Sequence, residues 1–596
     1  MNQVIPLQSD ERLPDTEHHF RVVAGPGAGK TYWLARHIVH VASHSKRLPP
    51  SSNIGVISYT NVAVRELVAD LGTSANLVDA STIHSFLFRH IVRPYAHLLS
   101  SADRTPLIAH HLVDTHGEHF PVYTHLKAWL QTHGKQNVLY QDATLERLKN
   151  CLQSLTVRVT NNQPTYATTV SPVQNSLQVL LTHESILAYK TLFWKEGNID
   201  HEDVLYLSFR LLHEFPLLRR FLSDRFPYVF IDEFQDTLPV QAAIVTWLAA
   251  EGTIVGVIGD PEQAIYGFID ASPTHFRNFQ LPSFRSYEIS GNRRSTDAII
   301  GLLNKVRTDA LQQTGLRNEA GTAPLVYAGD LGAAIVHAAT QVPENVGILV
   351  LGRKHDDIVL ARRAAEGNVN NDDPWEVLSG ADTDRMRFLL NLATATDLFR
   401  RGIYDTAVQR LVQGISSRNG FRDPLQFTPA VDIVLRRSVA MSLLQYLVSN
   451  HAELNALSTY TVYERLVAQV PGFADGLRLK AVRAGAFRTA AEHVPYRDLL
   501  LALRVPDETR TMRTIHQAKG SEADAVFVIL GRGHAAHILS PAPDIEEQRV
   551  LYVALSRARN HLFLYCPDAR LLAQFQTLGL RTHTVSPGPQ SQVAGS

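Results

Sequence analysis

The stretch that decides the fold is short and rich in glycine, and it reads Phe20-Arg21-Val22-Val23-Ala24-Gly25-Pro26-Gly27-Ala28-Gly29-Lys30-Thr31. Residues 20–23 predict a buried strand, and a helix is expected to begin near Thr31. This order of strand, loop and helix makes a phosphate cradle, because backbone N–H groups and the helix N-terminus face the anion. Lys30 is expected to reach the β and γ phosphates of a nucleotide, and Thr31 to bind Mg²⁺. A glycine-rich turn without a ligand is the alternative.

A second segment supplies the other half of a nucleotide site. The apolar run Tyr228-Val229-Phe230-Ile231 ends in two adjacent carboxylates, Asp232 and Glu233. An uninterrupted apolar run of this length is typical of a central strand in a parallel sheet. Asp232 is expected to hold Mg²⁺ through water, and Glu233 to polarise the water that attacks the γ phosphate. A solvated acidic turn is the alternative.

Strand and helix signals alternate near both ends of the chain, and two long internal stretches look helical. Further strands are expected at 54–58, 253–258, 287–289, 347–351, 511–514 and 525–529. This rhythm predicts an α/β fold with two parallel sheets, each interrupted by a helical insertion. The predicted domains are 1–91 with 199–290, insertion 92–198, 291–382 with 504–585, insertion 383–503, and a disordered tail at 586–596.

The amino-acid composition excludes some classes of protein but does not indicate a binding partner. The 596 residues carry 57 Lys and Arg against 57 Asp and Glu, so overall charge neither supports nor excludes nucleic-acid binding. Cys151 and Cys566 are the two cysteines, which excludes a disulfide framework and a cysteine-based metal cluster. Residues 1–10 lack the features of a signal peptide, and no stretch has the length and apolarity of a membrane span. We therefore expect a soluble cytoplasmic protein.

Six further motifs occur in a fixed order along the chain. They are Ser58-Tyr59-Thr60-Asn61, Ser81-Thr82-Ile83-His84-Ser85-Phe86, Gly259-Asp260-Pro261-Glu262-Gln263-Ala264-Ile265-Tyr266-Gly267-Phe268, Asn292-Arg293-Arg294-Ser295, Thr514-Ile515-His516-Gln517-Ala518-Lys519-Gly520-Ser521-Glu522 and Leu551-Tyr552-Val553-Ala554-Leu555-Ser556-Arg557-Ala558-Arg559. Together with the glycine loop and the segment Asp232–Thr237, they resemble the motifs of the UvrD/Rep/PcrA-like superfamily 1A helicases. The resemblance covers roughly residues 20–566 and implies two RecA-like motor domains that use ATP and Mg²⁺.

The resemblance also implies roles for single residues. The catalytic set would be Lys30, Thr31, Asp232, Glu233, Gln263, Arg294 and Arg557, with the two arginines as fingers that supply charge when the domains close. Nucleotide contacts would come from residues 24–31 and from Gln8, Tyr32, Arg293, Gly520 and Glu522. Contacts to single-stranded nucleic acid would come from Tyr59, Thr60, Asn61, His84, Tyr266, Phe268 and His516. Core packing remains the alternative for the aromatic residues, and a surface ion pair for the two arginines.

Departures from the family pattern concern the adenine site and the coupling motif. The family shows a glutamine upstream of the glycine loop, an arginine after its Lys-Thr, and a tyrosine in the first finger motif. Here Gln8 lacks the usual flanking pattern, Tyr32 follows Thr31, and Arg293 replaces the tyrosine. An arginine plane can stack on a purine, so we expect ATP binding with weaker discrimination against GTP. Ile269 stands where relatives carry an arginine, which predicts altered coupling between DNA and ATP.

Three functions remain open at this point. The first is a helicase or translocase on single-stranded and tailed duplex DNA, moving 3′ to 5′ as the resemblance implies, in repair, replication restart or defence against foreign DNA. The second is an ATP-driven, DNA-sensing regulatory subunit of a separate nuclease, because the second helical insertion looks short and Ile269 replaces the arginine of relatives. The third is an ATPase stimulated by RNA.

Overall fold

A computed structural model describes residues 4–49, 51–100, 106–113, 115–117, 119, 121–170, 175–267, 272–365, 373–414, 425–427, 433–503, 511–531 and 533–586. The chain forms two compact units. The first unit comprises Met1–Pro324 and Gly533–Leu562, and the second comprises Leu325–Arg532 and Phe563–Ser596. Residues 587–596, most of the predicted tail, lie outside the described residues, as do Phe268 and Ile269.

The first unit is built on a seven-stranded sheet in the order β1-β11-β2-β10-β9-β3-β4. Every neighbouring pair in this sheet is parallel. Its strands are β1 (Val4–Pro6), β2 (Phe20–Ala24), β3 (Ile54–Ser58), β4 (Val78–Thr82), β9 (Tyr228–Ile231), β10 (Ile254–Gly259) and β11 (Arg285–Ile289). The strands expected at 54–58 and 228–231 are confirmed, and those at 20–23, 253–258 and 287–289 are confirmed with small shifts at their ends.

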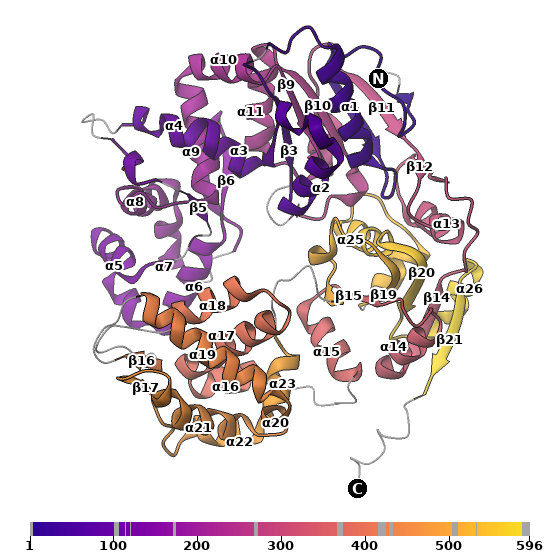
Figure 1. Ribbon diagram of the computed structural model, residues 1–596. Coiled ribbons are helices and arrows are strands. Elements are labelled where there is room, and N and C mark those ends of the chain that lie inside the picture. The colour runs from indigo at the N-terminus through magenta and orange to yellow at the C-terminus, as the bar shows by residue number, and fades with distance from the viewer. Residues whose placement is uncertain are drawn as a thin grey trace. The chain divides into compact units, whose positions relative to one another are not determined.

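Helices cover both faces of this sheet, because successive side chains of a strand point in opposite directions. On β9, Phe230 packs into one apolar core with α1 (Lys30–His44), and Val229 packs into the other with α11 (Pro239–Ala250). Figure 1 shows α1 and α11 on opposite sides of the strands. The α/β class predicted from the sequence is confirmed, and the carboxyl ends of β2, β9 and β10 all come to one edge of the sheet.

A close approach at Gly256 in β10 gives a stability prediction. A Cβ built on Gly256 would lie 2.2 Å from the Cζ atom of Phe20, whose ring is buried against Trp33 with ring centroids 5.8 Å apart. We expect Gly256→Ala to lower the free energy of unfolding by about 1 to 3 kcal/mol through overpacking. Gly301→Ala is the matched control, because a Cβ there meets nothing within 4 Å on an exposed helix position, and it should stabilise by about 0.5 to 1 kcal/mol. Calorimetric unfolding of both variants checks this, and equal midpoints would contradict it.

The stretch predicted as a helical insertion, 92–198, contains a β-hairpin among its helices. Helices α5 (Tyr123–Thr132), α6 (Asp142–Gln153) and α8 (His183–Trp194) are present, but β6 (Leu155–Thr160) and β7 (Gln163–Thr168) form an antiparallel hairpin. Asn161 and Asn162 turn the chain with φ values of 51° and 59°. Asparagine tolerates this left-handed backbone, which a two-residue hairpin turn requires. The flanking residues, which were expected to belong to a helical insertion, are therefore strands joined by a turn at residues 161–162.

The second unit contains a six-stranded sheet in the order β18-β15-β19-β20-β14-β21. β15 (Ile348–Gly352) pairs in parallel with β18 (Met512–Thr514) and β19 (Ala523–Ile529). β14 (Leu325–Gly329) pairs in parallel with β20 (Ala558–Tyr565) and β21 (Arg581–Val585). The second parallel sheet of the predicted fold is therefore confirmed, with β14, β20 and β21 as strands that the sequence did not indicate.

The rest of the second unit is mainly helical. Eight of its described helices are α16 (Pro374–Ala381), α17 (Thr383–Arg400), α18 (Tyr404–Gly414), α19 (Ile433–Ser449), α20 (His451–Asn455), α21 (Thr459–Gln469), α22 (Ala486–His493) and α23 (Tyr496–Leu501). These helices share one apolar core, and β16 (Leu425–Phe427) pairs antiparallel with β17 (Leu477–Leu479) beside them. No helix in the described parts of the chain is long and apolar enough to cross a membrane.

Candidate functional site

The glycine loop lies between β2 and α1 as predicted, although α1 begins at Lys30 rather than Thr31. Gly27 and Gly29 have φ values of 70° and 78°, a conformation that favours glycine. Gly29 is the N-cap of α1 and places no side chain over the first turn, so the N–H groups there face the loop. This is the backbone arrangement that binds a phosphate group.

Two further parts of the first unit form hydrogen bonds with the glycine loop. Asn292 and Gln313 each donate a side-chain hydrogen bond to the carbonyl of Pro26, at 3.1 and 2.8 Å. The backbone N–H of Arg293 donates to the carbonyl of Gly27 at 2.8 Å. A Cβ on Gly27 would lie 2.6 Å from the Asn292 Oδ1 atom, so only glycine fits beneath this segment. The contact of Gln313 was not predicted, because no local sequence pattern indicates contact with a loop that is distant in the sequence.

The two predicted carboxylates come to the same edge of the sheet as Lys30. The Lys30 Nζ atom lies 3.9 Å from Glu233 Oε1, and it donates to the carbonyl of Ala24 at 3.4 Å. Asp232 is only 6% exposed, which rules out the solvated acidic turn. Burial, and then the neighbouring Glu233 carboxylate, raise the pKa of Asp232 to about 7, while a hydrogen bond with Thr31 acts in the opposite direction. Asp232 and Thr31 are thus close enough to act on one ligand.

Glu233 is held by its backbone and by a glutamine. Its φ value of 53° is left-handed, which costs free energy for a residue with a Cβ and is found where a side chain must be aimed. Gln235 is fully buried and donates to the Glu233 carboxylate, and its Oε1 atom accepts from the backbone N–H of Asp260 at 3.0 Å. The carboxylate that was predicted to polarise water therefore has a fixed position.

Gln263 and the two predicted finger arginines lie in the same compact unit as the loop. The Arg557 guanidinium donates to Gln263 Oε1 at 3.0 Å, and Gln263 Nε2 donates to Asp260 Oδ2 at 2.8 Å. Arg294 donates to the carbonyl of Ser556 at 3.1 Å. Arg557 is 2% exposed, which excludes the surface ion pair for it. Burial lowers the pKa of Arg557 to about 9 and that of Arg294 to about 10, and Glu233 opposes both shifts.

Of the residues predicted to contact the adenine and ribose, some lie beside the glycine loop and others belong to the second unit. Arg293 donates from Nε to the hydroxyl of buried Ser9 at 2.9 Å, and a Cβ on Gly29 would lie 3.5 Å from the Ser9 Cβ atom. Gln8 is exposed and its backbone N–H donates to the Glu11 carboxylate at 2.7 Å. Tyr32 is 43% exposed, and Arg36 lies over its ring. Gly520, with φ of 83°, and exposed Glu522 belong to the second unit.

The predicted nucleic-acid contacts in the first unit include a stacked pair of aromatic rings. Tyr59 and Tyr266 have ring centroids 4.9 Å apart and an angle of 24° between their planes. Tyr59 is 38% exposed and is therefore not a core residue. Thr60 is the N-cap of α2 (Asn61–Leu71), and its hydroxyl accepts from the N–H of Ala63 at 3.2 Å. The pair offers flat faces beside a helix N-terminus.

The remaining predicted contacts differ in their surroundings. His84 lies on α3 (Ile83–Leu87), with its ring centroid 5.3 Å from that of His201. Burial, and then His201, lower the pKa of His84 to about 3, so this ring is neutral at physiological pH. His516 belongs to the second unit, where its Nδ1 atom lies 3.5 Å from the Arg353 guanidinium. The side chain of Asn61 and all of Phe268 lie outside the described residues.

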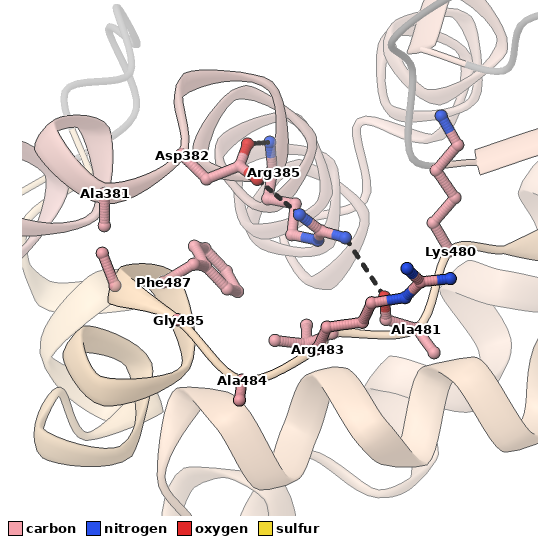
Figure 2. A pocket seen from close by; sticks show the side chains of 11 residues that line it. Ala381, Asp382, Arg385, Lys480, Ala481, Arg483, Ala484, Gly485 and Phe487 are labelled. Atoms are coloured by element: carbon pink, nitrogen blue, oxygen red, sulfur yellow. Dashed lines mark hydrogen bonds and ion pairs between the residues drawn. The ribbon is translucent and has the colours of Figure 1, made fainter.

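Cavities show where small ligands have room. A cavity of about 20 Å³ lies between Tyr59 and the carboxylates Asp232 and Glu233, which is space for roughly one water molecule. A cavity of about 620 Å³ lies in the second unit, where Arg385 donates to Asp382 and to the carbonyl of Ala481 (Figure 2). None of the predicted site residues lines this larger cavity, so cavity size alone does not mark the site.

Comparison with known proteins agrees with this arrangement. The UvrD/REP helicase N-terminal domain family matches residues 7–282, and the UvrD-like helicase C-terminal domain family matches residues 511–565. The two matches together cover more than half of the chain. A Bacillus subtilis (strain 168) protein assigned as the ATP-dependent DNA helicase YjcD is 24% identical, over 95% of this chain and 79% of its own length. The ATP-dependent DNA helicase PcrA of Staphylococcus aureus (strain Mu50) is 22% identical, over 95% of this chain and 83% of its own, and that of Bacillus subtilis is 21% identical over the same shares.

Proposed function

The chain belongs to the UvrD/PcrA-like helicase family, and on this premise we propose that it is an ATP-driven motor that moves 3′ to 5′ along single-stranded DNA and unwinds duplex DNA. The observation that carries the proposal is the meeting of Lys30, Glu233, Gln263 and Arg557 in one compact unit. Lys30, the carboxylates, the glutamine and the arginines are the groups that phosphoryl transfer needs, because that reaction is catalysed by positioning and charge.

The residues divide the work by their chemistry. The loop N–H groups and Lys30 would hold the phosphates, and Glu233 would take the proton of the attacking water, which its position beside Lys30 allows. Gln263 would orient the γ phosphate, while Arg557 and Arg294 would stabilise the charge that develops on its oxygens. Thr31 and Asp232 form an oxygen-only donor pair with one buried carboxylate, which fits Mg²⁺. When bound, Mg²⁺ would neutralise phosphate charge.

The link to DNA follows from the same segment of chain. Tyr266 comes three residues after Gln263, so a base that separates the Tyr59 and Tyr266 rings and stacks on them would shift the coupling motif. We propose residues 1–91 with 199–290 as one motor domain and 291–382 with 504–585 as the other, with helical insertions at 92–198 and 383–503. Closure of these domains would bring the arginine fingers to the phosphates once per cycle.

The experiment that tests this function is steady-state ATP hydrolysis by the purified chain with no nucleic acid, with single-stranded DNA and with single-stranded RNA. We expect DNA to raise the rate at least about tenfold, a coupling common between two ligand sites. RNA should raise it less. Equal or stronger stimulation by RNA would replace DNA by RNA as the substrate, and no hydrolysis at all would refute the assigned site.

A partner-dependent regulator of a separate nuclease is the second candidate. It is favoured by Ile269, at a position where relatives carry an arginine in the motif that couples DNA to ATP. Such a protein would hydrolyse ATP on DNA without displacing a strand by itself. Repair, replication restart and defence against foreign DNA are all compatible with either candidate.

A prediction about nucleotide choice arises from the adenine contacts. Discrimination between purines needs buried hydrogen-bond partners for the base, and Gln8 and Arg293 are both exposed. We expect the GTPase rate to exceed about one hundredth of the ATPase rate under the same conditions. Arg293→Tyr, which restores the family residue, should shift the ratio toward ATP. A GTPase rate below that fraction in the unaltered chain would contradict the prediction.

A further inference from the structure

Arg307 follows the last residue of α13 (Asp297–Val306) and is a buried cation that the proposed function does not use. Its guanidinium donates to Asp260 through NH2 at 2.8 Å and through NH1 at 3.1 Å. It also donates to the Tyr552 hydroxyl at 2.9 Å, and to Asp309 through NH2 at 2.8 Å and through Nε. All five N–H groups of the guanidinium therefore have acceptors. A charge this buried is tolerated only because it is fully paired.

Asp260 connects Arg307 to Gln263, a residue of the proposed catalytic set. The carboxylate, which is fully buried, also accepts from Gln263 Nε2 at 2.8 Å and from the backbone N–H of Glu262 at 3.2 Å. With Nε2 held by Asp260, the other end of the Gln263 amide points its oxygen at Arg557. Arg307 thus fixes a carboxylate that sets which way the Gln263 amide faces.

Tyr552 connects Arg307 to a helix that lies next to the finger arginine Arg557. Tyr552 lies on α25 (Glu546–Leu555), which ends two residues before Arg557, and α13 begins three residues after Arg294. Two more contacts run beside this one: Gln548 Nε2 donates to the carbonyl of Val306 at 2.8 Å, and Arg549 Nε to that of Ala264 at 2.7 Å. The end of α13, the start of the coupling motif and α25 therefore meet at one guanidinium.

We propose that Arg307 is a positioning residue for ATP hydrolysis, which holds Gln263 through Asp260 and aligns α13 and α25, the helices adjacent in sequence to Arg294 and Arg557. The proposal rests on the proposed function, since it assumes that Gln263 and Arg557 act on the γ phosphate. Asp260 falls in the proposed first motor domain, and Arg307 and Tyr552 fall in the second. If these proposed domains close during the cycle, the contact would tie the aligned state to closure.

The test compares Arg307→Met with the double variant Arg307→Met/Asp260→Asn. The single variant leaves a buried carboxylate without its cation, whereas the double variant removes both charges and keeps one oxygen acceptor, for Gln263 Nε2, at the loss of the 3.2 Å hydrogen bond from the N–H of Glu262. We expect Arg307→Met to lower kcat for DNA-stimulated ATP hydrolysis by at least about 30-fold with KM for ATP changed less than about threefold, because alignment matters most in the transition state. The double variant should recover kcat to within about fivefold of the unaltered value, because it leaves no buried charge without a partner.

A matched control separates positioning from stability. Lys190 is another fully buried cation of the first unit, paired with Asp200 and with Asp203 Oδ1 at 3.2 Å. Lys190→Met should lower the midpoint of thermal unfolding and leave kcat unchanged. If Arg307→Met does not fold, Arg307→Lys decides, because it keeps the charge but loses the forked donors and should cost about tenfold in kcat.

The outcomes are distinct. The proposal is overturned if the folded Arg307 variant, Met or Lys, keeps kcat within about threefold, if the double variant shows no recovery, or if Lys190→Met loses kcat equally. If the unaltered chain hydrolyses no ATP on DNA, the proposed function fails, and this proposal with it. A loss of kcat confined to the Arg307 variants, in a chain that is active on DNA, supports it.

Discussion

Glu233→Gln is expected to lower kcat for ATP hydrolysis by at least about 1,000-fold while ATP still binds, because an amide cannot accept the proton of the attacking water. The substitution preserves size, and Glu233 is fixed by its left-handed backbone and by Gln235. The geometry should therefore survive while the chemistry is lost. Hydrolysis is measured by phosphate release at saturating ATP and single-stranded DNA, and binding by fluorescence of a labelled ATP analogue.

Two further variants test whether the loss of hydrolysis is specific to the assigned site. Lys30→Ala should also abolish turnover, but through the loss of the cation that faces Glu233 and that is proposed to contact the phosphates. Glu251→Gln is the matched control, because Glu251 is an exposed glutamate just after α11 in the same unit and should leave kcat unchanged. Normal turnover in Glu233→Gln or Lys30→Ala would refute the assigned site.

Arg557→Ala is expected to lower kcat by about 1,000-fold or more, which is the usual contribution of an arginine finger to phosphoryl transfer. Arg557 is buried and donates to Gln263, and its pKa of about 9 keeps it charged at pH 7.5 even beside Arg294. Arg557→Lys should not restore the rate, because a lysine has no fork with which to contact Gln263 and a phosphate oxygen together.

The neighbouring Arg559 provides the control for this prediction. It lies two residues further on and is exposed, and its backbone carbonyl accepts from the N–H of Thr296. Arg559→Ala should therefore keep kcat within about threefold, as is common for surface substitutions. A similar loss in both variants, or full activity in Arg557→Ala, would remove Arg557 from the catalytic set.

The sequence predicted the central strands well because both of their faces are buried. Residues 228–231 and 54–57 are continuous apolar runs, and such runs mark interior parallel strands. β4 was missed because Val78–Thr82 lies at the edge of the sheet and reads Val-Asp-Ala-Ser-Thr, which has no apolar run. The β6–β7 hairpin was missed because its turn is Asn-Asn rather than a glycine pair.

The site was predictable where its chemistry is local in sequence. The glycine loop with Lys30 and the strand that ends in Asp232 and Glu233 each carry their signal within a few residues. Gln313 and Arg307 were missed because their contacts, with Pro26 and Asp260, join distant parts of the chain. No local sequence pattern indicates such a contact, and a buried arginine cannot be told from an exposed arginine by sequence alone.

The most direct test of the central claim is displacement of a labelled strand from a duplex with a 3′ single-stranded tail by the purified chain with ATP and Mg²⁺. The account predicts displacement that requires the 3′ tail and that is absent in Glu233→Gln. DNA-stimulated hydrolysis without any displacement would contradict a self-sufficient motor and leave the partner-dependent regulator in its place.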